Sequence, residues 1–240
     1  MFDALFTTTT EYKKLSHALS GKGACALFGL PASGRAQVYA ALCRQLDKPL
    51  CIVTPGEAEA TRFAADLNTL GIPAAVFPAR DYVLRPIEGT AREYEYRRLA
   101  VLGELVGGRL RAVAVPAEAL TQFTTPKEDF CANTRTLHAG DTLLRDDLLA
   151  ALFGAGYTRR AQVDGPGQFS VRGDIVDIFA PDQKMPVRME FWGDEIDTLH
   201  TFDLTTQRRE DAIDKFYLSP AREVLFGKPA DAAEQLRAFL

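Results

Sequence analysis

The sequence has few of the residues that build metal centres or disulfide frameworks. Its 240 residues include four cysteines and three histidines. The cysteines form no Cys-x-x-Cys pair and no cluster with histidine, which argues against a zinc site and against a disulfide scaffold. We therefore predict no metal site, and reduced cysteines that serve as small apolar core residues. The cysteines are Cys25, Cys43, Cys51 and Cys131.

Long hydrophobic runs and a strong charge of one sign are also missing. No apolar run approaches the roughly 20 residues of a membrane-spanning helix. The N-terminus lacks a basic start followed by an apolar stretch, as a secretory signal would have. We therefore expect a cytoplasmic protein without a membrane partner. The net charge of −4 gives no overall attraction to nucleic acid, although local basic patches remain possible.

The apolar content is sufficient for a sizeable core, because 47% of the residues are hydrophobic. In the first half of the chain, short apolar runs alternate with helical patterns. This alternation is typical of a doubly wound parallel sheet. The predicted strands are 24–28, 49–55, 74–77 and 110–115, and the helices between and around them include 11–19, 57–70 and 93–106.

The second half follows a different pattern, which begins after the polar stretch 124–129. We predict a strand at 134–138, a helix at 144–153 and then an antiparallel meander. Two strands of the meander are predicted at 187–192 and 196–202, with Trp192 in the core. This arrangement indicates a separate α+β module.

The meander starts in GPGQFSVRGDIVDIFAP, residues 165–181. Apolar residues alternate there with Arg172, Asp174 and Asp177, as in a strand with one face in the core and the other in water. Gly173 permits a bulge or a turn at this point. The arginines on the exposed side indicate a surface that another molecule binds.

A phosphate-binding loop is suggested by GLPASGRAQ, residues 29–37. The spacing of Gly29 and Gly34 fits the P-loop template, but Arg35 replaces the lysine and Ala36 replaces the hydroxyl residue. In a working loop the lysine contacts the β- and γ-phosphates and the hydroxyl ligates magnesium. The last strand of this half also ends without an acidic Walker B pair. We interpret the segment as a relic loop; weak anion binding by backbone amides at the helix N-terminus is the alternative.

Three motifs carry a family resemblance: RGDIVDIFAP at 172–181, RMEFWGDEID at 188–197 and FDLTTQRR at 202–209. In this order they resemble the domain shared by the UvrB subunit of the bacterial excision nuclease and the transcription-repair coupling factor. The resemblance is close from about residue 136 to 220 and looser elsewhere. It implies that this domain docks onto UvrA, the damage-recognition ATPase.

The altered loop distinguishes the two relatives. The resemblance to UvrB implies an intact loop with lysine and an aromatic-rich hairpin that probes damaged DNA. The connection 79–92 is too short for that hairpin, and Tyr82 is its only aromatic residue. The closer resemblance is therefore to the N-terminal UvrB-like module of the coupling factor, and we expect the chain to be part of a larger protein whose motor lies farther along.

The resemblance also implies a fold class and a domain plan. The fold is α/β, with a degenerate P-loop-type parallel-sheet domain and an inserted α+β antiparallel-sheet domain. Residues 1–123 correspond to the UvrB-like domain 1a and residues 124–216 to the UvrA-binding domain 2. Residues 217–240 begin domain 1b, where the chain returns to the first domain.

The candidate UvrA-binding residues are Arg159, Arg160, Phe169 and Arg172. Arg159 and Arg172 match family arginines at positions that resemble UvrA contacts, whereas Ser170 stands where the family has a further arginine. Arginine is enriched among interface hot spots. The alternative is that these arginines only pair with Asp164, Asp174 or Asp177. Phe169 is either an interface aromatic or a core residue.

The function implied is that of a non-catalytic adaptor that recruits UvrA to stalled RNA polymerase, with no catalytic residues and no cofactor. The full-length parent is expected to be an ATP-dependent DNA translocase that binds RNA polymerase and DNA through other domains. Its motor part is expected to mask the UvrA-binding surface by an intramolecular contact. One alternative is a UvrB-like ATP-dependent damage-verification subunit. Another is direct DNA binding, which would be strongly salt-dependent and which the acidic balance disfavours.

Overall fold

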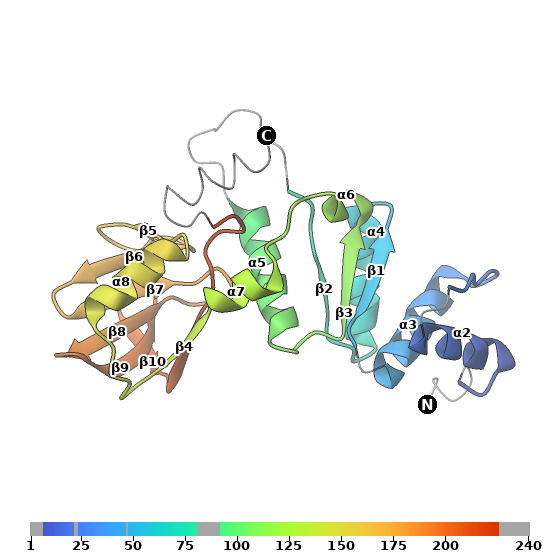
Figure 1. The fold of residues 1–240 in the computed structure, drawn as a ribbon, viewed down its shortest axis with the longest axis horizontal. Coiled ribbons are helices and arrows are strands. Elements are labelled where there is room, and N and C mark those ends of the chain that lie inside the picture. The colour runs from blue at the N-terminus through green and yellow to red at the C-terminus, as the bar shows by residue number, and fades with distance from the viewer. Residues whose placement is uncertain (1–6, 22–23, 47, 81–91, 226–240) are drawn as a thin grey trace. The chain divides into compact units, whose positions relative to one another are not determined.

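The computed structural model describes residues 7–21, 24–46, 48–80 and 92–225 (Figure 1). The chain divides into two compact units. Unit 1 comprises Met1–Tyr82 and Glu104–Gln122, and unit 2 comprises Val83–Gly103 and Phe123–Leu240. Residues 81–91, most of the short connection with Tyr82, lie outside the described residues, as do residues 226–240 of the predicted third segment. The predicted domain plan therefore stays a prediction.

Unit 1 contains a three-stranded parallel sheet with the strand order β1-β3-β2. The strands are β1 (Leu50–Thr54), β2 (Ala74–Val76) and β3 (Ala112–Pro116), and every residue of the central strand β3 is buried. The helices of this unit are α2 (Thr10–Ser20), α3 (Ala32–Gln45), α4 (Glu57–Thr69) and α6 (Ala117–Leu120). The parallel sheet predicted for the first half is thus present, with three of its four expected strands.

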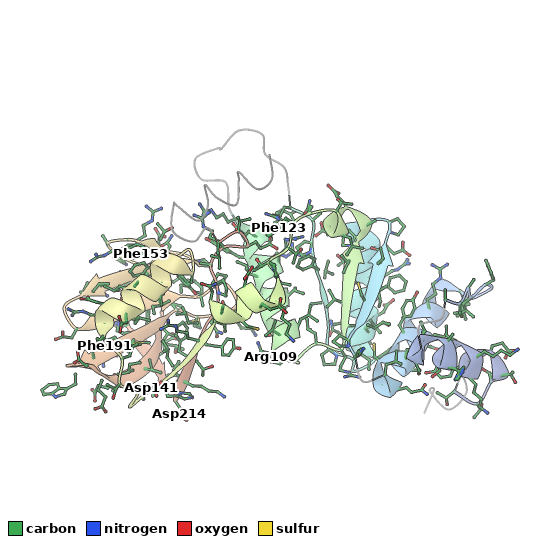
Figure 2. All side chains as sticks on the ribbon, viewed as in Figure 1. Arg109, Phe123, Asp141, Phe153, Phe191 and Asp214 are labelled. Atoms are coloured by element: carbon green, nitrogen blue, oxygen red, sulfur yellow. The ribbon has the colours of Figure 1, made fainter. Side chains whose placement is uncertain are left out.

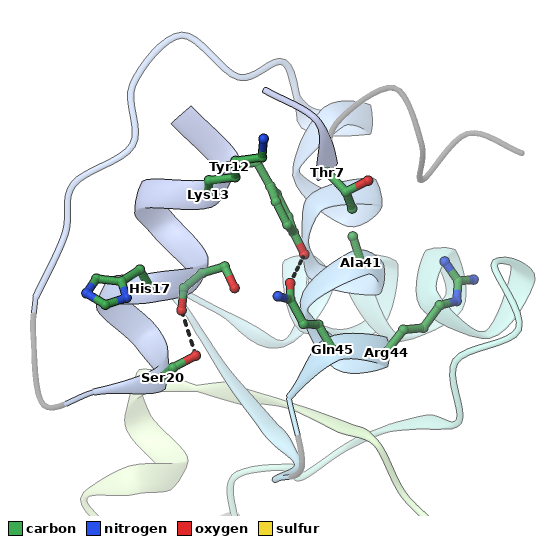
Figure 3. A pocket seen from close by; sticks show the side chains of 9 residues that line it. Thr7, Tyr12, Lys13, His17, Ser20, Ala41, Arg44 and Gln45 are labelled. Carbon is green, nitrogen blue, oxygen red and sulfur yellow. Dashed lines mark hydrogen bonds between the residues drawn. The ribbon is translucent and has the colours of Figure 1, made fainter. Parts of the chain in front are cut away.

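Helix α4 shows why the spacing of apolar residues predicted this part of the fold correctly. Its buried residues Ala60, Phe63, Ala64 and Leu67 recur at the helical spacing and share a core with residues of α3, β1 and β3. Helices α2 and α3 pack through a smaller cluster, in which Tyr12 donates a hydrogen bond to Gln45 Oε1 at 3.0 Å. Beside this contact lies an open pocket of about 540 Å³ (Figure 3).

Two expectations were wrong, one for the sheet of unit 1 and one for the cysteines of the whole chain. Residues 24–28 form no strand, and β1 rather than this segment is the edge of the sheet. The apolar run lies exposed, with Phe28 88% accessible, because a local pattern cannot supply the partner strand that burial requires. Cys43 is buried, but Cys25, Cys51 and Cys131 are exposed. Cys51 faces outward because Ile52 and Thr54 take the inward positions of β1.

Unit 2 is built around a six-stranded sheet with the order β10-β9-β8-β7-β6-β5. All neighbouring pairs are antiparallel except β5 with β6. The strands are β5 (Thr158–Arg159), β6 (Gln168–Arg172), β7 (Ile175–Phe179), β8 (Val187–Trp192), β9 (Glu195–Phe202) and β10 (Arg209–Ala212). The antiparallel meander is confirmed, and mixed α/β architecture with parallel and antiparallel sheets is the fold class of the chain.

Other elements complete unit 2. The two-stranded sheet joins β4 (Arg135–His138) to β11 (Lys215–Leu218), and the helices are α7 (Lys127–Ala132), α8 (Arg145–Gly154) and α5 (Glu93–Val106), whose residues up to Gly103 belong here. Helix α8 lies across one face of the six-stranded sheet (Figure 1). Among the described residues, every helix is too short or too polar to cross a membrane.

The core of unit 2 lies between the six-stranded sheet and α8. Leu148 and Leu152 of α8 pack there with Phe169, Ile178 and Met189. Trp192, predicted in the core, is instead 83% exposed. Its position follows from strand alternation, because Val187, Met189 and Phe191 take the inward positions of β8 and leave Trp192 outward.

A fully buried ion pair joins distant segments of unit 2. The Arg98 guanidinium of α5 contacts both carboxylate oxygens of Glu223 at 2.9 Å, and neither side chain is exposed. Arg98 also donates to Phe123 O and Thr124 Oγ1 at 3.1 Å, and the Thr125 hydroxyl donates to Glu223 O. Three segments far apart in sequence therefore meet at one buried arginine.

Candidate functional site

The six-stranded sheet has a polar face opposite the face that packs on α8. Paired residues of neighbouring strands project to the same face of a sheet. Ser170 is paired with Asp177, Asp177 with Arg188, and Ile175 with both Arg172 and Glu190. We call the set Ser170, Arg172, Asp177, Arg188 and Glu190 the polar face. Ser170, Asp177 and Arg188 are buried, Glu190 is half-buried, and Arg172 is exposed.

Asp177 is the centre of this polar face. Its side chain is completely buried, and it accepts hydrogen bonds from two arginines. Arg172 Nη2 lies 2.6 Å from Asp177 Oδ2. Arg188 Nε lies 2.7 Å from Oδ1, and its Nη2 lies 3.0 Å from Oδ2. One carboxylate therefore faces two guanidinium groups, which leaves an excess of positive charge at this point.

The two arginines differ in exposure. Only 10% of the Arg188 side chain is accessible, and its guanidinium carbon lies 4.7 Å from the centre of the Phe202 ring. In contrast, 48% of the Arg172 side chain is accessible. Arg172 is thus held at one nitrogen while about half of its side chain is accessible to solvent, a geometry suited to an acidic partner.

The neighbouring charges are paired with each other. Arg145 donates to Gly173 O at 2.8 Å and contacts Asp174 Oδ1 at 3.3 Å, so Asp174 is the partner of Arg145. Glu190 contacts Arg209, whose side chain is 47% exposed. Of the acidic partners considered from sequence, the one that Arg172 contacts is therefore Asp177.

The structure does not bring the predicted arginines together. Arg159, in the edge strand β5, is exposed and is paired with Phe169, so it projects to the α8 side of the sheet rather than to the polar face. Arg160 follows directly and is also exposed; its backbone amide bonds to Phe169 O at 2.8 Å. It lines a cavity with Arg92 and Arg97 of the α5 region. Arg159 and Arg172 thus flank the β5–β6 edge from opposite faces.

Phe169 lies in the core rather than on the surface. Its side chain has no exposed area, because it alternates along β6 with Ser170 and Arg172. Sequence reasoning missed Phe153, at the end of α8, which is 56% exposed and contacts Phe169 edge to face with ring centres 5.2 Å apart (Figure 2). The available signal was the helical spacing of Leu148 and Leu152, which turns Phe153 away from the core centre.

In unit 1, the altered phosphate loop has a geometry of its own. Helix α3 begins at Ala32, so Gly34 lies within its first turn, and the Arg35 amide is bonded to Pro31 O at 3.1 Å. The Arg35 guanidinium lies 3.8 Å from the Glu59 carboxylate. Ala36 is buried in the core and carries no oxygen. Gly29 has a φ of 82°, so a glycine is required in the turn before the helix.

Comparisons with known proteins agree with the motifs of unit 2. Residues 136–224 match the UvrB interaction domain family. Transcription-repair-coupling factors of Bacillus subtilis and Mycobacterium tuberculosis are 28% and 37% identical to the chain over 212 and 219 residues, which cover 88% and 87% of it. UvrABC system protein B of Chlorobium limicola is 28% identical over 226 residues, 88% of the chain.

The chain spans 18% of the length of each of these coupling factors and 32% of the length of that UvrABC system protein B. The matched residues 136–224 contain the six-stranded sheet, including Arg159, Phe169 and Arg172. The comparisons therefore confirm the resemblance that the motifs predicted: residues 136–224 carry a UvrB interaction domain, and the chain is similar over most of its length to transcription-repair-coupling factors.

Proposed function

We propose that the chain is a non-catalytic adaptor module that binds UvrA. Within a transcription-repair coupling factor, it would recruit UvrA to stalled RNA polymerase. The observation that carries this proposal is the coincidence of two features in one sheet. Residues 136–224 match the UvrB interaction domain, and the polar face of the same sheet exposes an arginine that is already held in place.

Arg172 is the proposed anchor of the interface. Its bond to the buried Asp177 restricts the side chain before any partner arrives, so less conformational entropy is lost on binding. A planar guanidinium forms paired hydrogen bonds with carboxylates, and arginines are frequent among interface residues that lose much affinity on truncation. We therefore expect UvrA to present acidic groups to this face.

Arg159 and Arg160 are proposed as a second set of contacts at the β5 edge. Both side chains are exposed. The two arginines come shortly after Tyr157, whose side chain is buried just beyond the end of helix α8. Phe169 would act indirectly, because it fills the core beneath this edge and its ring contacts the ring of Phe153. A partner that covers the edge would contact Phe153 rather than Phe169.

The altered phosphate loop supports an adaptor rather than an ATPase. We propose that it is a degenerate P-loop without a working Walker A motif. Arg35 is directed to Glu59, Ala36 is buried, and the Arg35 amide is used within the helix. None of these contacts favours the alternative function, that of a UvrB-like ATP-dependent damage-verification subunit.

The remaining proposals concern the parent protein. Residues 1–123 would be domain 1a, residues 124–216 the UvrA-binding domain 2, and residues 217–240 the start of domain 1b. RNA polymerase and DNA would bind to other domains of a cytoplasmic translocase. Its motor part would cover the polar face by an intramolecular contact until UvrA is needed.

Calorimetric titration of the chain with purified UvrA tests the adaptor proposal. We expect saturable binding that weakens as salt is added, because the contact is charged. The chain should bind UvrA without added ATP, because its altered phosphate loop takes no part in UvrA binding. If the unmutated chain shows no heat of binding and is not retained by immobilised UvrA, the proposal is wrong.

A further inference from the structure

Trp192 lies at the tip of the hairpin that joins β8 to β9. It is the single tryptophan of the chain, and 83% of it is exposed. A lone exposed apolar side chain is common on protein surfaces, so exposure by itself assigns no role. Its fixed backbone and its position on the sheet distinguish Trp192 from such a residue.

The backbone on both sides of Trp192 is held by hydrogen bonds to other segments of unit 2. The Phe191 amide donates to Asp174 O at 2.9 Å, which joins β8 to the turn between β6 and β7. Beyond Trp192, Asp194 O accepts a hydrogen bond from the Leu143 amide at 2.7 Å. The turn that carries the indole is therefore fixed in advance, and little backbone freedom is lost when a partner binds there.

Trp192 projects to the same side of the sheet as Arg172. Phe191 packs in the core beneath α8, so strand alternation turns Glu190 and Trp192 to the opposite side. Ile175 is paired with both Arg172 and Glu190, so these three residues form one row across the sheet on that side. Trp192 is the next residue of β8 on this side, directly beyond the row. The indole therefore continues the surface that contains Arg172.

The row beside Trp192 can be covered by a partner without leaving an isolated charge. The Glu190 carboxylate is paired with Arg209, and the Thr198 hydroxyl lies 3.3 Å from its Oε2. Ile175 is partly exposed and adds apolar surface between the charged residues. Burying a charge that is already paired costs less than burying a free one. The surface thus combines an aromatic residue, an aliphatic residue and an arginine, a composition typical of the centre of an interface.

We propose that Trp192 is a second anchor of the UvrA interface, and that UvrA receives it in an apolar depression beside the acidic groups that bind Arg172. The inference rests on the proposed function and adds a source of specificity to it. Arg172 alone would bind any suitably placed acidic group, whereas an indole in a fixed position also requires an apolar depression of matching shape. Tryptophan and arginine are both enriched among interface residues that lose much affinity on truncation.

Calorimetric titration of UvrA with Trp192→Ala tests this anchor. We expect an affinity at least about tenfold lower than that of the unmutated chain. Trp192→Phe keeps an aromatic ring and should lose less. Phe28→Ala is the matched control, because Phe28 is an exposed aromatic residue of unit 1, and it should bind as the unmutated chain does. The melting temperature of Trp192→Ala should be unchanged, since so exposed a side chain contributes little to packing.

A second measurement does not depend on the folding of a variant. Because Trp192 is the single tryptophan, 7-azatryptophan incorporated into the chain reports on this position alone, and it can be excited where the tryptophans of unlabelled UvrA absorb little. Acrylamide should quench its fluorescence strongly in the free chain and much less in the complex with UvrA.

The outcomes separate this inference from the proposed function. If UvrA binds the unmutated chain, any one of three results overturns the anchor: unchanged affinity in Trp192→Ala, an equal loss in Phe28→Ala, or undiminished quenching in the complex. If the unmutated chain does not bind UvrA, the proposed function is wrong and the anchor is wrong with it.

Discussion

Arg172 and Asp177 form an ion pair across the β6–β7 hairpin in which the Asp177 side chain is completely buried while the Arg172 side chain remains about half exposed. Arg188 takes two further bonds of the same carboxylate from the buried side. Asp177 is therefore balanced without Arg172, and Arg172 can act at the surface. Arg172 can therefore be bonded to Asp177 within the fold and still bind a partner protein through its exposed part.

The β7 strand provides a matched pair of isoleucines for testing the sheet assignment. Ile178 is fully buried beneath α8, whereas Ile175 lies on the polar face and is partly exposed. We expect Ile178→Ala to lower the free energy of unfolding by about 2–5 kcal/mol because it leaves a cavity. Ile175→Ala should cost less than about 1 kcal/mol. Urea denaturation checks both, and equal losses would contradict the assigned faces.

The features predicted from sequence are those that a local pattern specifies. Helix α4 and the strands β8 and β9 follow from spacing and alternation. Residues 165–181, predicted as one alternating strand with a bulge or turn at Gly173, form the two strands β6 and β7 instead. Along β8 the alternation turns Phe191 inward and Trp192 outward. The contacts that were missed join residues far apart in the chain. Arg98 and Glu223 are separated by 125 positions, and nothing near either residue indicates its partner.

The segment 24–28 illustrates the same limit. Its apolar run predicts a strand, but a strand also needs a neighbour with free backbone groups, and the sequence carries no signal for that pairing. For the candidate site, sequence indicated the arginines but not their directions. The register of β5 against β6 and of β6 against β7 places Arg159 and Arg172 on opposite faces.

The buried Arg98–Glu223 pair should be essential to unit 2. Glu223→Ala leaves the guanidinium charge buried without its carboxylate, and we expect a loss of about 3–5 kcal/mol in the free energy of unfolding. The double variant Arg98→Met/Glu223→Leu removes both charges and should recover much of that loss. Glu104→Ala is the control, because its pair with Arg109 is exposed and should contribute less than about 1 kcal/mol. A Glu223→Ala loss no larger than the control would show that the pair is dispensable.

Tyr157 should make unit 2 sensitive to alkaline pH. Its hydroxyl donates to Ser219 O at 2.7 Å, and burial, with a smaller effect of the Asp182 carboxylate, raises the pKa of Tyr157 well above its ordinary value. The unfolded chain therefore loses this proton first, at about pH 10, and the stabilisation declines as pH rises beyond that value. We expect the stability advantage of the unmutated chain over Tyr157→Phe to shrink between about pH 9 and about pH 11. Tyr217→Phe serves as the control, and a constant difference across this range would contradict the assignment.

The chain should not hydrolyse ATP. Arg35 replaces the lysine of a working loop and Ala36, which is buried, replaces the magnesium-binding hydroxyl. Phosphate release measured with magnesium and ATP should stay at the level of a blank. Turnover that disappears in Gly34→Ala or Arg35→Gln would overturn this prediction, since contaminating activity would not respond to either change.

The UvrA interface should depend on Arg172. Arg172→Ala removes the exposed guanidinium and leaves Asp177 bonded to Arg188, so the fold should persist while affinity for UvrA falls by about 2 kcal/mol, roughly thirtyfold. Arg172→Glu should weaken binding further, because it opposes the acidic groups expected on the partner. Arg159→Ala, on the other side of the β5–β6 edge, should have a smaller effect.

Arg62→Ala provides the matched control for these variants, because Arg62 is an exposed arginine of unit 1, and it should leave UvrA affinity unchanged. Thermal melts should place the arginine variants within a few degrees of the unmutated chain. Calorimetric titration then separates two results. Unchanged affinity in both Arg172 variants would remove the polar face as the docking surface. A loss shared equally by Arg62→Ala would instead show that the measured binding is a general effect of positive charge.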